Sequence, residues 1–281
     1  MTAQVVLWRG VLTSSGMSDL PMPSREPYPT DLTDEQWALI EPFVLASTCG
    51  PQEQRYPRRE VVNAILYINH TGAQWRYMPH DLPDWALVYH YFDLWKKNGT
   101  WKKLNDVLRR KVRKKAGREE EPTAGILDSQ SVKTTEEANT RGYDAGKKVK
   151  GRKRHLLVDT LGLLLVAWIS TADVQDRDAT QAVLPLAAKD YPTLKKVWAD
   201  GAYQGPQVEK VAKESGIEVE VVKRSDQVKG FVVQPKRWIG ERTFGWYNRE
   251  RRLSKDYERT EESSEAFLYI GMTRLMLRRL A

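Results

Sequence analysis

The sequence predicts an α/β protein in which a mixed five-stranded sheet with helices follows a small all-helical region. Apolar residues recur at helical spacing in the first part of the chain, and short apolar runs alternate with helical stripes in the second. Between them, the acidic stretch Glu119-Glu120-Glu121-Pro122 reverses the positive charge of the preceding residues and interrupts the helical spacing of apolar residues. We therefore expect a disordered lead over residues 1–27, a helical domain over 28–118 and a sheet-containing domain over 119–281.

Composition favours an acidic partner. The 281 residues suffice for a sizeable core, and the net charge of +8 with a pI of about 9.4 points to nucleic acid as the commonest partner, with an ordinary basic protein as the alternative. The single cysteine, Cys49, excludes an internal disulfide framework and fits a reducing compartment. No apolar run approaches the roughly 18 residues of a membrane span, and the start does not resemble a signal peptide. The sequence thus predicts a cytoplasmic, nucleoid-associated protein without a membrane partner.

Four helices are expected in the helical region. Thr33 and Gln36 have the spacing of a capping box, and Gly72, Gly99 and Gly117 follow the later stripes. The apolar stripes are Trp37, Ile40 and Val44; Val61, Ala64, Ile65 and Ile68; Trp85, Val88, Phe92 and Trp95; and Trp101, Leu104, Leu108 and Val112.

The second region is expected to hold five strands. The two strands that flank the Leu161-Gly162 turn are close enough to form an antiparallel hairpin. Three antiparallel strands followed by helix, strand, helix, strand and helix is the order of the ribonuclease H-like fold, in which strand one lies next to strand four. The expected strands are 123–132, 154–160, 163–171, 195–201 and 218–223, and the expected helices are 178–189, 206–215, 238–255 and 263–280, with a loop over 225–236.

Two aspartates end short apolar runs in this order. Asp128 follows Ala124-Gly125-Ile126-Leu127, and Asp200 follows Val197-Trp198-Ala199. Adjacent strands would bring the two carboxylates side by side at the carboxyl edge of the sheet, where ligand and metal sites of open α/β sheets lie. Each aspartate has a simpler interpretation as a turn residue. Asp159 is expected to be structural at its tight turn, and Asp173, Asp176 and Asp178 are interpreted as helix caps.

A third carboxylate is expected on the segment 238–255. Ile239, Trp246 and Leu253 recur every seven residues and would face the core, while Glu241 lies roughly 200° away on a polar face. Glu250 is interpreted as a surface salt-bridge residue, and Glu258 lies past the expected helix end. The simpler alternative for Glu241 is a surface pair with Arg237 or Arg242.

Three such carboxylates suit phosphodiester chemistry. Two Mg²⁺ ions roughly 3.5–4 Å apart can grip the attacking and leaving oxygens of a phosphate. Hard carboxylate oxygens suit Mg²⁺ or Mn²⁺ as ligands. The sequence therefore predicts a two-metal site held by Asp128, Asp200 and Glu241.

Basic residues flank this presumed site and are predicted to contact DNA phosphates. The alternative is a solvated charged surface. The residues concerned are Lys111, Arg113, Lys114 and Lys115; Lys147, Lys148, Lys150 and Arg152; and Arg237, Arg249 and Arg252.

Several stretches resemble DDE transposases of bacterial insertion sequences, of the insertion-sequence-four/five type. The resemblance runs from about Tyr28 to the end of the chain. In the helical region it rests on Tyr28–Trp37 (YPTDLTDEQW), Gly72–Arg76 (GAQWR) and His80–Pro83 (HDLP). Further on it rests on Leu127–Lys133 (LDSQSVK), Lys153–Asp159 (KRHLLVD), Ala172–Asp178 (ADVQDRD), Trp198–Tyr203 (WADGAY) and Glu241–Trp246 (ERTFGW).

The resemblance implies that Asp128, Asp200 and Glu241 are the catalytic triad. Relatives often place a Tyr, an Arg and a Lys around the glutamate. Arg237 matches the Arg, whereas Gln234 and Asn248 stand at the Tyr and Lys positions, which makes Arg249 and Lys255 the candidate replacements.

The resemblance further implies a transposase that binds the terminal inverted repeats of its element in double-stranded DNA. With two Mg²⁺ or Mn²⁺ ions it would cleave the ends and join the freed 3′-hydroxyls to target DNA, as a homodimer or larger assembly. The alternatives are a catalytically inactive DNA-binding regulator and a metal-dependent nuclease without strand transfer.

Overall fold

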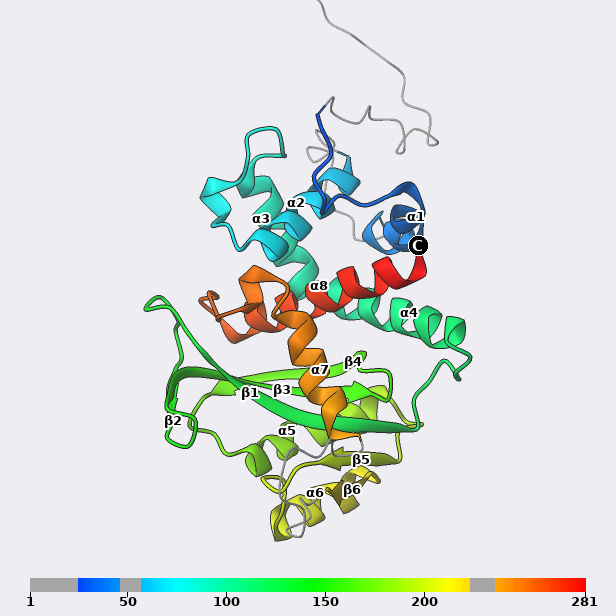
Figure 1. Ribbon diagram of the computed structural model, residues 1–281, viewed down its shortest axis with the longest axis vertical. Coiled ribbons are helices and arrows are strands. Elements are labelled where there is room, and N and C mark those ends of the chain that lie inside the picture. The colour runs from blue at the N-terminus through cyan, green and yellow to red at the C-terminus, as the bar shows by residue number, and fades with distance from the viewer. Residues whose placement is uncertain (1–24, 46–56, 223–235) are drawn as a thin grey trace, which may run out of the picture.

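Four helices form the first part of the molecule, as the apolar stripes predict. The computed structural model describes residues 25–45, 57–222 and 236–281, so residues 1–24 of the expected lead and nearly all of the expected loop over 225–236 lie outside the described residues. The helices are α1 (Asp34–Leu45), α2 (Arg58–Thr71), α3 (Trp85–Lys97) and α4 (Thr100–Lys115), with a short 3₁₀ turn at Trp75–Tyr77 (Figure 1).

Local sequence sets the ends of these helices. The capping box at α1 is confirmed, because the Gln36 amide donates to Thr33 Oγ1 and the Thr33 amide donates to Gln36 Oε1, each at 3.2 Å. Gly72 ends α2 at φ +72°, a left-handed conformation that favours glycine.

One mixed sheet forms the second part. The five strands that the sequence predicts lie in the order β4-β3-β1-β5-β6. Strand β1 is antiparallel to β3 and parallel to β5, as expected for a ribonuclease H-like arrangement. A sixth strand, β2, pairs with the start of β3 and was not predicted, because its three residues carry no apolar alternation. The bounds are β1 Ala124–Lys133, β2 Gly142–Asp144, β3 Val149–Asp159, β4 Leu164–Thr171, β5 Lys196–Ala199 and β6 Glu218–Val221.

Helices cover both faces of this sheet. Helices α5 (Asp176–Asp190) and α6 (Pro206–Ser215) pack on the face that carries Leu127 and Val197. Helices α4, α7 (Arg237–Tyr247) and α8 (Glu261–Leu280) lie on the face that carries Ile126 and Trp198 (Figure 1).

The helix expected over 238–255 ends early, at Tyr247, and a 3₁₀ turn follows at Arg251–Leu253. Glu250, just before this turn, and Arg252, within it, are buried and bonded to residues outside the turn. These tertiary contacts override the helical periodicity of the segment.

Helix α8 joins the two parts of the molecule. It contacts all four N-terminal helices and also strand β4, so that one hydrophobic cluster runs from α1–α4 into the sheet (Figure 1). The domain division at residue 119 stays a prediction. Over the described ranges, no helix combines the length and apolar character that crossing a membrane requires.

Glu265, on α8, provides a pH-dependent test of this packing. Burial raises the pKa of its carboxyl to about 7, Lys102 acts in the opposite direction and Glu262 adds to the increase. In the unfolded chain the pKa is about 4.3, so between these values the folded protein binds more protons than the unfolded chain. The free energy of unfolding is therefore expected to fall as the pH rises from about 4 to about 7 through this group.

Glu265→Gln removes this charge and should stabilise the protein at pH 8 by up to about 3 kcal/mol, with little effect at pH 4. Urea denaturation at both pH values measures the difference. Glu214→Gln on α6 is the matched control, because Glu214 is exposed. An equal effect of Glu265→Gln at both pH values would contradict the expected titration.

Candidate active site at the sheet edge

Asp128 and Asp200 lie level with each other on adjacent parallel strands. The last paired residues of β1 and β5 are Ile126 and Trp198, and each aspartate follows two residues later. Both side chains are half-buried. The expected adjacency of the two strands is thus present, at the edge of the sheet where parallel strands end.

Backbone donors orient both carboxylates. The Ser129 amide donates to Asp128 Oδ1 at 2.8 Å, and the Ala202 amide donates to Asp200 Oδ1 at 2.9 Å. A carboxylate held by a neighbouring backbone amide loses less side-chain entropy when it binds a ligand. The turn interpretation holds for Asp200 and is compatible with ligand binding, whereas Asp128 lies within β1 and not in a turn.

Helix α7 lies directly on Asp128. A Cβ atom added to Gly240 would lie 2.7 Å from Asp128 Oδ2 and 2.9 Å from Asp128 Cβ, so the absence of a side chain permits this close approach. The next residue, Glu241, is exposed, as are Gly245, Asn248 and Arg249 on the same face, while Ile239 is buried. The predicted outward face is confirmed for these residues. The Arg237 side chain lies outside the described parts of the structure.

The donor set fits a hard divalent cation. Carboxylate oxygens are the ligands that Mg²⁺ and Mn²⁺ prefer. In the described ranges, however, no three His, Cys, Asp or Glu side chains are grouped so that they could hold a metal ion. The geometry supports Asp128 and Asp200 as a pair, and Glu241 as the third ligand stays a prediction.

A second polar cluster lies behind the aspartates, on the face that α5 covers. Ser129 Oγ donates to Asp176 Oδ1 at 2.9 Å, and Lys153 Nζ lies 3.1 Å from the same oxygen. The Tyr203 hydroxyl is buried nearby, and the pKa of this phenol is raised well above its usual value by burial and by Asp176, Asp128 and Asp200. One tyrosine therefore experiences the charge of all three carboxylates.

The sequence predicts that Asp176 caps α5, and this prediction is wrong. Gln175 occupies the N-cap position without a side-chain capping bond, and the Asp176 carboxylate instead binds Ser129 and Lys153. Sequence reasoning missed that Asp176 and Tyr203 lie beside the aspartates, and Lys153, which its position in a basic run suggests as a phosphate contact, is instead bound to Asp176 within the protein. The signal was their position in three of the stretches that carry the family resemblance.

The predicted phosphate-binding residues divide into two groups. Those that remain exposed are Lys111, Lys114, Lys115, Lys147, Lys148, Lys150 and Arg249. Arg113, Arg152 and Arg252 are buried, so the prediction of phosphate contacts is wrong for these three.

The buried arginines bind the protein itself. Arg113 Nη1 lies 2.7 Å from Asp159 Oδ2, and Arg252 Nε lies 2.8 Å from Glu258 Oε1. Arg152 donates to the carbonyls of Glu258 and Arg259. Their position has a physical cause: Arg113 continues the inward stripe of α4, one residue after Val112, and Arg152 lies on β3, which has a strand on each side and covered faces. Asp159 is structural, as predicted, because it also accepts bonds from the amides of its own turn.

Arg113→Met should lower the free energy of unfolding by about 3–5 kcal/mol, because it leaves the Asp159 carboxylate buried without its cation. Lys111→Met, two residues earlier on the exposed face, should change it by less than about 0.5 kcal/mol. Urea denaturation of both variants measures the difference. Similar values for the two would show that the Arg113 pair does not stabilise the fold.

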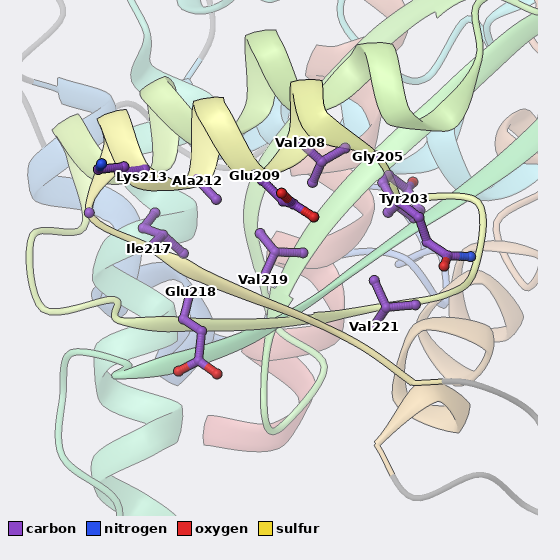
Figure 2. Close-up of a pocket in the computed structure, with 12 residues that line it drawn as sticks. Tyr203, Gly205, Val208, Glu209, Ala212, Lys213, Ile217, Glu218, Val219 and Val221 are labelled. Atoms are coloured by element: carbon purple, nitrogen blue, oxygen red, sulfur yellow. The ribbon is translucent and has the colours of Figure 1, made fainter.

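An apolar cavity of about 460 Å³ lies further along the sheet (Figure 2). It opens between α6 and β6, and Val208, Ala212, Ile217 and Val219 line it. Charged side chains are few among its lining residues, and Tyr203 connects it to the region of Asp200. Its lining offers packing surface and no converging catalytic groups.

Comparison with known proteins agrees with this geometry. A family model described as a transposase DDE domain matches residues 119–277, and one described as a putative transposase of the IS4/5 family matches residues 32–105. A putative transposase for insertion sequence element IS402 from Burkholderia cepacia is 30% identical over 128 residues, which are 43% of this chain and 60% of that protein. Uncharacterized protein y4sN from Sinorhizobium fredii is 31% identical over 81 residues, 29% of this chain and 65% of that protein.

The aligned parts of this chain thus span less than two thirds of either relative. The DDE domain match covers more than half of the chain, including Asp128, Asp200 and Glu241. With the order of the strands and the paired aspartates, it shows that the chain belongs to the DDE transposases.

Proposed function

We propose that this protein binds the terminal inverted repeats of an insertion sequence, cuts the DNA at their ends and joins the freed 3′-hydroxyls to target DNA. The observation that carries the proposal is the level placement of Asp128 and Asp200, each two residues beyond the last paired position of two adjacent parallel strands, with α7 lying on Asp128. Each end is hydrolysed at one phosphodiester bond, and the resulting 3′-hydroxyl then attacks a target phosphodiester and displaces its 3′-oxygen.

Asp128, Asp200 and Glu241 would hold two Mg²⁺ or Mn²⁺ ions. Such ions stabilise the charge on the phosphate and lower the pKa of an attacking water. The protein's own contribution is to orient the carboxylates through the amides of Ser129 and Ala202.

Positive side chains support the DNA on either side. Lys147 and Lys148 are exposed in the β2–β3 turn, Lys150 is exposed at the start of β3, and Arg249 is exposed just after α7. Lys111, Lys114 and Lys115 extend the positive surface along α4, although Lys114 also lies 3.6 Å from Glu120. Contacts from these residues would position the duplex without reading its sequence. Two ends must be processed together, so a homodimer or larger assembly is proposed.

The decisive experiment gives the purified protein pre-cut ends with 3′-hydroxyls and a plasmid target. Joined product supports a transposase. Nicking of uncut ends without joining would indicate a nuclease, and binding without either reaction would indicate a regulator.

Cleavage should depend strictly on Mg²⁺ or Mn²⁺, because the two aspartates offer only hard oxygen ligands. Excess EDTA is expected to stop end cleavage, and readdition of Mg²⁺ or Mn²⁺ to restore it. Gel analysis of labelled ends measures the product. Robust cleavage in excess chelator would contradict the metal mechanism.

A further inference from the structure

A polar cleft of about 520 Å³ adjoins the candidate active site on the side opposite α7. Lys153, Gln175, Asp176, Arg177 and Gln204 line it, together with the Gly201-Ala202 turn. That turn directly follows Asp200, and Asp176 binds Ser129, which directly follows Asp128. The cleft is therefore next to both strands that carry the aspartates.

We propose that this cleft holds one nucleotide of the DNA strand next to the bond that is cut, with Arg177 contacting its phosphate. The proposal rests on the proposed function and assigns a DNA-contact site beyond it. The volume lies within the roughly 300–1,000 Å³ of pockets that hold small molecules, which suits a nucleotide.

The wall of the cleft is fixed by Lys153 and Asp176. The Lys153 side chain is buried, its Nζ donates to the Val174 carbonyl at 2.7 Å, and it lies 3.1 Å from Asp176 and 3.8 Å from Asp144. Its positive charge is thus compensated within the protein. Lys153 shapes the cleft, and a different cation has to attract the phosphate.

Arg177 is that cation. It is exposed in the first turn of α5, at the cleft. Within residues 25–45, 57–222 and 236–281, no carboxylate forms a salt bridge with its guanidinium. An uncompensated arginine beside a cleft suits phosphate, since the planar guanidinium can donate two parallel hydrogen bonds to phosphate oxygens.

Two glutamines add uncharged contacts. Gln175 is exposed at the N-cap of α5, and Gln204 Nε2 donates to the Gly201 carbonyl at 2.6 Å, which holds its side chain over the turn. Amides of this kind can bond to sugar or base atoms. Arg177 therefore supplies the charge, and the glutamines border the space for the rest of the nucleotide.

The location defines which part of the DNA enters the cleft. α7, which carries Glu241 and is followed by Arg249, lies on the face of the sheet that carries Ile126. α5 and the cleft lie toward the face that carries Leu127. A DNA strand that crosses the two aspartates would have α7 on one side and the cleft on the other. The cleft and Arg249 should thus serve opposite sides of the cut bond.

The test compares Arg177→Ala with Lys189→Ala, a matched loss of charge on an exposed residue at the far end of α5. The probe is a labelled duplex that carries the terminal inverted repeat and its flank, and binding is followed by anisotropy at several salt concentrations. Arg177→Ala should reduce the slope of log affinity against log salt by about 0.7–0.9, the value for one lost phosphate contact, whereas Lys189→Ala should leave it unchanged.

A second arm shortens the duplex one nucleotide at a time on either side of the cut bond. The defect of Arg177→Ala should disappear when one side is shortened, and the defect of Arg249→Ala when the other side is shortened. Equal slopes for Arg177→Ala and Lys189→Ala, or a defect that persists on every shortened duplex, would overturn the cleft assignment. A wild-type protein that binds these duplexes without cutting them would instead contradict the proposed catalysis, and the binding arm would still decide on the cleft.

Discussion

Asp128→Ala and Asp200→Ala are each expected to reduce end cleavage by several orders of magnitude while DNA binding persists. The two carboxylates lie level on neighbouring strands, so removal of either one eliminates half of the pair proposed to hold the metal ions. When catalytic residues act as a unit, removing one of them abolishes nearly all of the enzyme's activity. The cleavage rate of the double variant should therefore be little lower than that of either single variant. Labelled inverted-repeat ends incubated with Mg²⁺ measure the rate.

The matched control is Asp190→Ala, which removes a carboxylate at the far end of α5 that pairs with Lys102 at the surface. This variant should cleave at nearly the wild-type rate. Thermal unfolding of all the variants separates chemistry from folding. If Asp128→Ala or Asp200→Ala lost binding together with folding, a purely structural role of that aspartate would be supported instead.

The strands and the two aspartates could be predicted from the sequence because their signals are local. An apolar run that ends in a carboxylate marks a strand and the place where its parallel pairing ends, as at Leu127-Asp128 and Ala199-Asp200, although β1 itself continues to Lys133 beside β3. The order of the elements then brings the two strands together. The adjacency of β1 and β5, the first and fourth of the predicted strands, is a property of the ribonuclease H-like fold.

The density of basic residues in the sequence does not predict which arginines are buried. Arg113 and Lys114 are neighbours in one basic run, yet the first is buried against Asp159 and the second is exposed. What separates them is the partner, which is 46 residues away in the sequence. A run of basic residues predicts a positive surface only for those members that lack a distant carboxylate or carbonyl.

Asp176 shows a related difficulty. A carboxylate at the start of a helix is most simply interpreted as a cap. Its actual partners, Ser129 and Lys153, come from two strands that meet only in the folded sheet. The local sequence therefore did not predict the partners of a side chain that lies where three elements meet.

Glu241→Gln is expected to reduce cleavage by several orders of magnitude without loss of stability, whereas Glu250→Gln should do the reverse. Glu241 is exposed on α7, next to the glycine that lies on Asp128, so its replacement disturbs no packing. Glu250 is buried, contrary to its interpretation as a surface salt-bridge residue, and lies 2.6 Å from Arg274 and 3.1 Å from His70. Glu250→Gln should lower the free energy of unfolding by about 3 kcal/mol, because Arg274 then lacks its counter-charge.

The two measurements are made on the same samples: cleavage of labelled ends, normalised to the folded fraction, and urea denaturation. Glu258→Gln serves as a second buried control, since Glu258 pairs with Arg252 at 2.8 Å and burial raises the pKa of its carboxyl. Both buried variants should retain the cleavage rate per folded molecule. If Glu241→Gln remained active while Glu250→Gln or Glu258→Gln lost cleavage at full stability, the third ligand would lie on the segment after α7, and the pairing of Asp128 with Asp200 would remain the basis of the site.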